Sequence, residues 1–131
     1  MSSTYASPRS SAAYQEAAVL TAPPERLVVM LYDGARRFLY QAAAAMREER
    51  HRDGLERLRR AELIIDELLC TLDLEAGGEI ASNLQGLYVF FGRHLAEAGR
   101  ERDPAKLDWV NGQLAELREA WAQIGTTTAA A

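Results

Sequence analysis

Glu48 and His51 have a spacing that is typical of metal centres in helical bundles, a carboxylate three residues before a histidine. A di-metal centre there needs that pair on each of two helices and a further glutamate on each of the other two. The sequence supplies the pair once, because its other histidine, His94, has Phe91 at the corresponding position. We therefore expect no metal site.

Two pairs of carboxylates lie four residues apart and would each share one face of a helix, Glu62 with Asp66 and Glu97 with Glu101. Paired carboxylates can perform acid–base chemistry where burial shifts their pKa values. Arginines flank both pairs, which favours solvated helix faces held by ion pairs. The sequence also has no Ser/His/Asp order, glycine-rich phosphate loop or zinc-binding spacing. We expect no catalytic residue, no cofactor and no enzymatic activity.

Cys70 is the single cysteine, so no disulfide can form within the chain and a reducing compartment is expected. The formal net charge of -4 argues against nucleic acid as the main partner. The first residues contain no apolar signal-peptide core, and no apolar run approaches about 18 residues, so we expect no membrane insertion. These observations favour a cytoplasmic location.

The elements that carry these residues are expected to be helices. Alanine is abundant, and glycine and proline are sparse inside the long segments of this 131-residue chain. We expect one all-α domain, an antiparallel up-down four-helix bundle over residues 24–124, because short breaks favour antiparallel neighbours. The expected helices cover residues 24–50, 53–75, 79–101 and 104–124.

The expected helix ends depend on a few capping residues. Asp53 is a candidate N-cap of the second helix, and Gly77-Gly78 is expected to end it. Asp103 followed by Pro104 is a strong start signal for the fourth helix. Residues 1–23 are expected to be a flexible N-terminal segment in which 14–20 form a short helix, and residues 125–131 a disordered tail.

Two features of the predicted helices indicate how they pack against one another. The fourth helix has one heptad seam, which predicts packing at about 20° to its neighbours. Gly34, inside the first helix, predicts a close helix crossing there. The seam of the fourth helix consists of Leu107, Val110, Leu114, Leu117, Trp121 and Ile124.

An apolar surplus remains beside the seams, at Ile64, Tyr88, Phe90 and Trp109. One interpretation is that these residues thicken the core or line a homodimer interface. The other is a groove that accepts an amphipathic helix of a partner protein, with residues 14–20 occupying part of it when the partner is absent. The residue pattern alone leaves both interpretations open.

Several short motifs follow one another along residues 14–124, and together they resemble the FliS family of flagellin-specific export chaperones. They are Tyr14-Gln15 with Thr21-Ala22 and Pro24, LVVMLYDG at 27–34, AELIIDEL at 61–68, GGEIASNL at 77–84, Leu87-Tyr88, Arg93 with Leu95, Asp103 with Leu107, and LREAW at 117–121. Each motif alone is weak, and their unbroken order makes the resemblance specific.

The resemblance implies a cytosolic chaperone that binds the disordered C-terminal segment of flagellin, prevents its premature polymerisation and assists its delivery to the flagellar type III export gate. It also implies contacts with other flagellar regulators. The alternative is an adaptor or regulatory bundle that binds a helix of another cytosolic protein. Through the resemblance, residues 1–23 are expected to cap the groove, and Tyr14 takes the partner-binding role of the family tyrosine, with Val19 and Leu20 following by position only. The other expected partner-binding residues, each with a core role as its alternative, are Leu31, Tyr32, Leu39, Ile64, Leu68, Tyr88 and Phe91.

Overall fold

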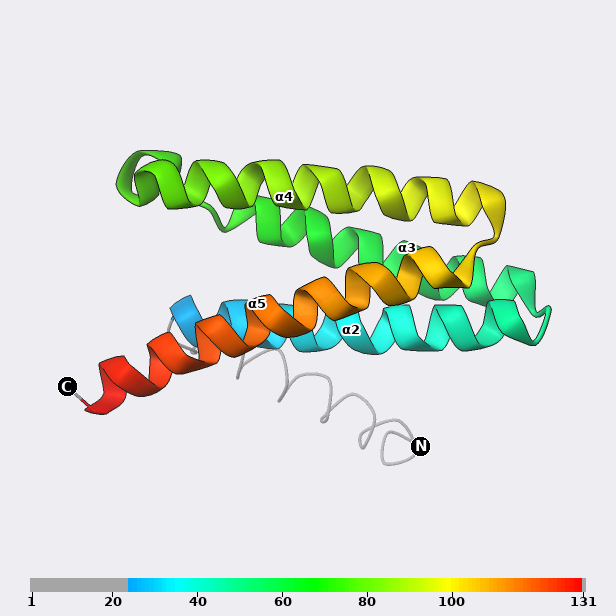
Figure 1. The fold of residues 1–131 in the computed structure, drawn as a ribbon, viewed down its shortest axis with the longest axis horizontal. Helices are drawn as coiled ribbons and strands as arrows, with labels where there is room; N and C mark the ends of the chain where they lie inside the picture. The colour runs from blue at the N-terminus through cyan, green and yellow to red at the C-terminus, as the bar shows by residue number, and fades with distance from the viewer. Residues whose placement is uncertain (1–23, 131) are drawn as a thin grey trace, which may run out of the picture.

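The structure, a computed structural model, describes residues 24–130, and within that range the chain is helical with no strand (Figure 1). Successive helices run in opposite directions, so the expected all-α up-down four-helix bundle is confirmed. None of the described helices is long and apolar enough to cross a membrane. The helices are α2 (Pro24–Arg47), α3 (His51–Cys70), α4 (Leu74–Glu101) and α5 (Pro104–Ala130).

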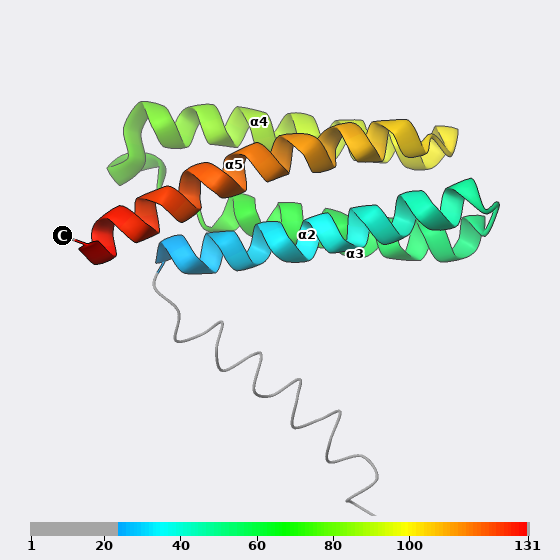
Figure 2. The ribbon, with the colours of Figure 1, turned by 60° about the horizontal axis from the view of Figure 1, so that its bottom comes forward.

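The four helices do not pack with equal closeness. α2 packs extensively against both α3 and α5, whereas α4 contacts α3 less and α5 least of all. Figures 1 and 2 agree that α4 and α5 lie side by side near their connection and diverge towards the start of α4. The bundle is therefore closed at the end that holds the α2–α3 and α4–α5 connections and open at the other.

α2 forms the centre of the bundle because its buried face alternates large and small side chains. A Cβ atom at Gly34 would lie 3.2 Å from Cδ1 of Ile64 on α3, so the predicted close crossing at this glycine is confirmed. The alanines of this face let the neighbouring helices approach without a cavity. The buried residues of α2 are Val28, Tyr32, Ala35, Leu39, Ala42, Ala43, Ala45 and Met46.

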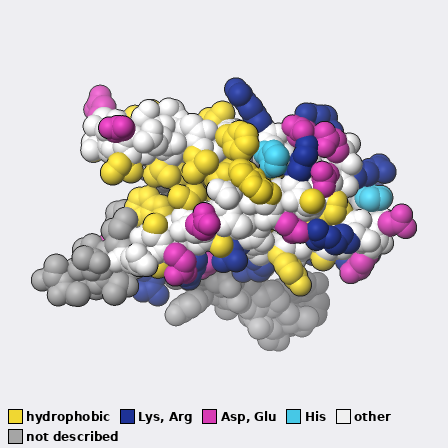
Figure 3. Space-filling model, in the orientation of Figure 1, with side chains coloured by type: hydrophobic (Ala, Val, Ile, Leu, Met, Phe, Trp, Pro, Cys, Tyr) yellow, Lys and Arg dark blue, Asp and Glu magenta, His cyan; other side chains and the backbone are white. Residues whose placement is uncertain are grey.

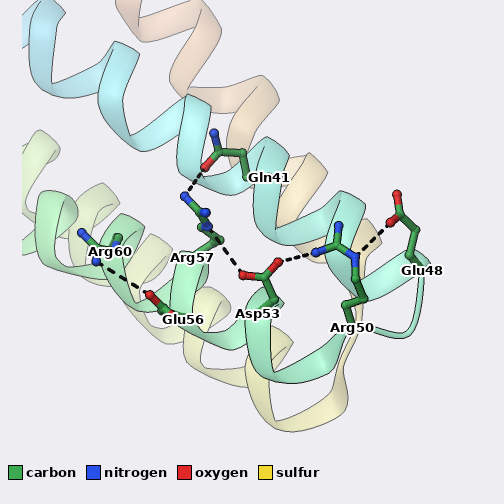
Figure 4. Close-up of polar contacts among 7 residues, drawn as sticks. All are labelled: Gln41, Glu48, Arg50, Asp53, Glu56, Arg57 and Arg60. Carbon is green, nitrogen blue, oxygen red and sulfur yellow. Dashed lines mark hydrogen bonds and ion pairs between the residues drawn. The ribbon is translucent and has the colours of Figure 1, made fainter. Parts of the chain in front are cut away.

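The start of α3 differs from the prediction. The N-cap is Arg50, whose side chain makes no capping hydrogen bond, and Asp53 lies inside the first turn of the helix. Asp53 pairs instead with Arg50 and, at 3.8 Å, with Arg57, whose Nη1 donates to Gln41 Oε1 on α2 at 3.1 Å (Figure 4). A carboxylate in the first turn still favours the helix through its macrodipole.

The connection between α3 and α4 is also misplaced in the prediction. α3 ends at Cys70 and not near residue 75, and the carboxylate of Asp73 accepts a hydrogen bond from the amide of Ala76 at 3.0 Å to begin α4. Gly77-Gly78 therefore lies inside α4 and not at the end of α3. Gly78 kinks the helix there with φ 53° and ψ -131°, a conformation that glycine adopts without strain.

α5 confirms the predicted start and, as far as Trp121, the predicted seam, whose last residue, Ile124, lies outside the described side chains. Its backbone continues past the predicted end. Asp103 Oδ1 accepts a hydrogen bond from the amide of Ala105 at 3.0 Å, as an N-cap does. Leu107, Val110 and Leu114 are fully buried. The helical backbone continues to Ala130, where the sequence predicted a disordered tail from residue 125.

Candidate functional site

The structure places most of the predicted partner-binding residues in the core. Five of them, Tyr32, Leu39, Leu68, Tyr88 and Phe91, are at most 1% exposed. A partner reaches their side chains only if the helices separate, so their contact with a partner stays a prediction. Two others, Leu31 and Ile64, are partly buried and pack against that core, and the remaining three, Tyr14, Val19 and Leu20, lie outside the described residues.

Part of the exposed apolar surface lies instead on α4 and α5, which diverge towards the open end, whereas Tyr40, Leu55 and Leu63 are exposed on α2 and α3. Figure 3 shows hydrophobic side chains gathered in the hollow between α4 and α5. Ile80 of α4, which lines a cavity between the helices, is 73% exposed. Phe90 of α4 and Trp109 of α5, whose rings meet, are 47% and 45% exposed. We call this surface the α4–α5 groove and define it by Ile80, Leu84, Phe90, His94, Trp109 and Trp121.

The closed end of the groove is an aromatic cluster. The rings of Phe90 and His94 stack with centroids 5.6 Å apart, and Trp109 of α5 meets both rings nearly edge-on, at 5.8 Å and 5.2 Å. Trp109 also lies 6.3 Å from the ring of the fully buried Phe91, which anchors the cluster to the core. Such pairs each contribute about 0.5–1.5 kcal/mol beyond their buried area, so the cluster is a preorganised apolar surface.

The open end of the groove widens into a cavity of about 360 Å³. Its walls come from the first turns of α2, the α3–α4 connection, the kinked start of α4 and the second half of α5. The lining is mostly apolar, which suits a hydrophobic side chain or helix face. The principal lining residues are Val28, Leu72, Ile80, Leu84, Tyr88 and Trp121.

A hydrogen-bonded trio joins three helices beneath this cavity. The indole Nε1 of Trp121 donates to the hydroxyl of Tyr32 at 3.1 Å, and the hydroxyls of Tyr32 and Tyr88 are hydrogen-bonded to each other. Burial raises the pKa of both hydroxyls, although the hydrogen bonds from Tyr88 and Trp121 partly offset this at Tyr32. Both phenols are therefore neutral near pH 7, and their role is to position α2, α4 and α5.

Polar contacts explain why α5 follows α2 and leaves α4. Arg118 Nε of α5 lies 2.8 Å from Asp33 Oδ1 of α2, and Arg36 Nε of α2 donates to Asn111 Oδ1 of α5 at 2.8 Å. Within the described residues, ion pairs between α4 and α5 are those of Lys106, at the closed end. Towards the start of α4, the two helices diverge and no ion pair between described residues joins them, which leaves the groove accessible.

The two carboxylate pairs differ in the structure, since Glu97 and Glu101 form ion pairs whereas Glu62 is partly buried. Glu97 and Glu101 both bind Lys106 of α5, where the sequence predicted arginine partners, and the hydrogen bond from Lys106 lowers the pKa of Glu97. Partial burial raises the pKa of Glu62, against the opposing effect of Arg59. Within residues 24–130, no three His, Cys, Asp or Glu side chains are placed to hold a metal ion together.

Comparison with known proteins identifies the family of this chain. The family model described as "Flagellar protein FliS" matches residues 6–128. The chain belongs to the FliS family. The members of this family are chaperones and not enzymes, so this protein is a flagellar export chaperone.

Several relatives carry the name flagellar secretion chaperone FliS. The Salmonella typhimurium protein is 40% identical over 110 residues, which cover 83% of this chain and 82% of that protein. The Vibrio cholerae protein is 40% identical over 103 residues, covering 79% and 76% of the two chains. The Bacillus subtilis protein is 34% identical over 111 residues, covering 85% and 82%.

The sequence indicated part of this site. Phe90 and Trp109 stood out as apolar residues beside the seams, and both are half-exposed walls of the groove. Ile80 was not among the predicted partner-binding residues, yet it is 73% exposed and lines the cavity. A sequence signal was available in the Gly77-Gly78 pair shortly before it, because glycine permits the kink in α4.

Proposed function

We propose that this FliS-family protein binds the disordered C-terminal segment of flagellin in the cytoplasm, prevents its premature polymerisation and assists its delivery to the flagellar type III export gate. The observation that supports this most is the α4–α5 groove, an exposed apolar surface with a preformed cavity at one end. A chaperone of this kind has to cover the apolar face of an amphipathic helix, and such a helix binds through anchors spaced along one face.

The energetics favour an extended groove over one tight pocket. Ordering a disordered segment on binding costs about 2–5 kcal/mol or more of the gross contact energy. Half-exposed Phe90 and Trp109 at one end and exposed Ile80 at the other provide separate apolar anchors. Each anchor that becomes buried contributes about 1–2 kcal/mol, so several are needed to offset the ordering cost.

The experiment is a titration of the full-length protein with a peptide from the flagellin C-terminus. Both tryptophans of the chain, Trp109 and Trp121, belong to the groove, so their fluorescence reports its occupation directly. We expect a shift of their emission to shorter wavelength with saturable binding. No detectable binding at tens of micromolar peptide would contradict the proposed function.

Matched variants locate the binding surface. Ile80→Ser removes a side chain that is 73% exposed and whose burial by a partner contributes about 1–2 kcal/mol, so Kd should rise about 5- to 30-fold. Leu63→Ser is the control, because Leu63 is 51% exposed on α3, outside the groove. Equal effects of the two substitutions would place the binding surface elsewhere.

The N-terminal segment and the assembly state belong to the same proposal. Residues 1–23, with Tyr14, Val19 and Leu20, cap the groove until the partner displaces them. Deletion of residues 1–20 should then increase the binding of a hydrophobic dye without changing helicity, and unchanged dye binding would exclude the cap. Light scattering tests the alternative, a homodimer or an adaptor that uses the same groove, since a tight dimer would occlude it.

A further inference from the structure

The two ends of the bundle carry very different charge. Around the open end, residues 24–33, 66–84 and 116–123 contain nine carboxylates and two arginines, a formal charge of -7. Around the closed end, residues 47–57 and 97–108 contain eight carboxylates and seven basic residues, a formal charge of -1. Nine of the 19 carboxylates of the protein therefore lie at the open end, and two of them, Glu25 and Asp73, line the cavity itself.

Most of this charge has no counter-ion within the described residues. Arg118 pairs with Asp33 and Glu119, and the carboxylate of Asp73 caps α4. The remaining carboxylates form no ion pair with any described residue, and Glu25 belongs to the cavity lining itself. The unpaired carboxylates of this end are Glu25, Asp66, Glu67, Glu75, Glu79 and Glu116.

A favourable interaction with the helix dipole accounts for only some of these unpaired carboxylates. Glu25 and Glu75 lie in the first turns of α2 and α4, where a carboxylate is favourable. Glu67 lies in the last turn of α3, which has no basic residue, and there a negative charge opposes the helix dipole. Glu79 precedes Ile80 in the chain and lies in the first turn after the Gly78 kink, where a carboxylate is again favourable. Helix stabilisation therefore leaves Glu67 without an explanation.

A partner helix in the cavity would displace water from the carboxylates of the open end, which we call the acidic rim. A carboxylate that loses its water without gaining a cation is strongly destabilised. Clustered charge beside low-dielectric walls also attracts ligands of opposite charge and repels ligands of like charge. An apolar helix with acidic flanks would therefore be rejected, and one with basic flanks would be attracted and held.

We propose that the α4–α5 groove selects an amphipathic helix that carries lysine or arginine beside its apolar face at the end that enters the cavity. This inference rests on the proposed function, since it specifies the chemistry of the segment that the groove binds. Charge at the rim acts mainly on association rate and selectivity, and apolar contact in the groove provides most of the affinity.

The experiment compares two synthetic helical peptides of about 18 residues, the length that spans about 27 Å. Both have the same leucine and isoleucine face, and they differ only in carrying lysine or glutamate on its flanks. At about 50 mM salt the lysine peptide should bind the full-length protein about tenfold more tightly, and at about 300 mM salt the difference should shrink several-fold through screening. Equal affinity of the two peptides would overturn the inference.

Matched variants test the role of the acidic rim. Glu25→Gln with Glu79→Gln should reduce the advantage of the lysine peptide about fivefold. Glu49→Gln with Glu56→Gln removes the same charge at the closed end and should leave the advantage unchanged. A urea-unfolding curve for each variant checks that it is folded. Equal reductions by both pairs would show a general charge effect and would overturn the inference.

The outcomes also separate this inference from the proposed function. If the flagellin peptide binds and the charge variants behave alike, the charge selection is wrong and the chaperone function stands. If neither synthetic peptide nor the flagellin peptide binds, both proposals fail.

Discussion

Gly54 offers a direct test of the close packing between α2 and α3. It is buried in the first turns of α3. A Cβ atom added there would lie 3.0 Å from Met46 Cγ and 3.2 Å from the carbonyl oxygen of Ala42. Gly54→Ala therefore places a methyl group against the backbone of α2.

Two effects of opposite sign decide the result. Alanine gains up to about 1 kcal/mol over glycine in helix propensity. Overpacking a well-filled interior costs about 1–3 kcal/mol. Met46 can adjust its side chain, but the Ala42 carbonyl belongs to the backbone of α2 and cannot move alone. We expect packing to dominate, with a net loss of about 1–2 kcal/mol in the free energy of unfolding.

Gly112→Ala is the matched control. Gly112 is exposed on α5, and a Cβ atom there would meet nothing within 4 Å. The same substitution should then show the propensity gain alone, about 0.5–1 kcal/mol of added stability.

Urea unfolding followed by far-ultraviolet circular dichroism measures both variants. With a slope of about 1–3 kcal/mol per molar urea, the midpoint of Gly54→Ala should fall by about 0.5–1 M. The midpoint of Gly112→Ala should rise, with unchanged slopes. A midpoint for Gly54→Ala at or above that of the wild type would refute the packing argument.

Three further predictions concern capping, alkaline pH and a surface ion pair. Asp103→Ala removes the N-cap of α5 and should lower the free energy of unfolding by about 1 kcal/mol in urea, whereas an unchanged midpoint would exclude a capping role. The raised pKa values of Tyr32 and Tyr88 keep both phenols protonated in the folded state while the unfolded chain loses these protons above about pH 10. The two phenols should therefore leave the free energy of unfolding unaffected below that pH and lower it above by about 1.4 kcal/mol per pH unit for each phenol. The fall should be less steep in Tyr88→Phe. Equal slopes in the variant and the wild type would contradict this. Arg118→Gln breaks a largely exposed pair with Asp33 and should cost no more than about 1 kcal/mol by thermal or urea unfolding, so a larger loss would show that α5 depends on this contact.

Local sequence signals predicted the fold class and much of the element order. The alternating three- and four-residue steps of Leu107, Val110 and Leu114 predict one buried helix face wherever that helix packs, and all three are fully buried. Asp103 before Pro104 defines a helix start by local hydrogen bonding alone. The α3–α4 connection was misplaced because its capping residue, Asp73, follows no glycine or proline.

Tertiary structure decided which apolar residues are core and which form the groove. Tyr88 and Phe90 are two residues apart on α4 and looked equivalent beside the predicted seam. Tyr88 is 1% exposed because it meets Tyr32 of α2, whereas Phe90 is 47% exposed although its ring lies 5.8 Å from that of Trp109 on α5. Periodicity determines which residues share a helix face, but burial depends on how close the neighbouring helix comes, and that distance is set by contacts between residues far apart in the chain.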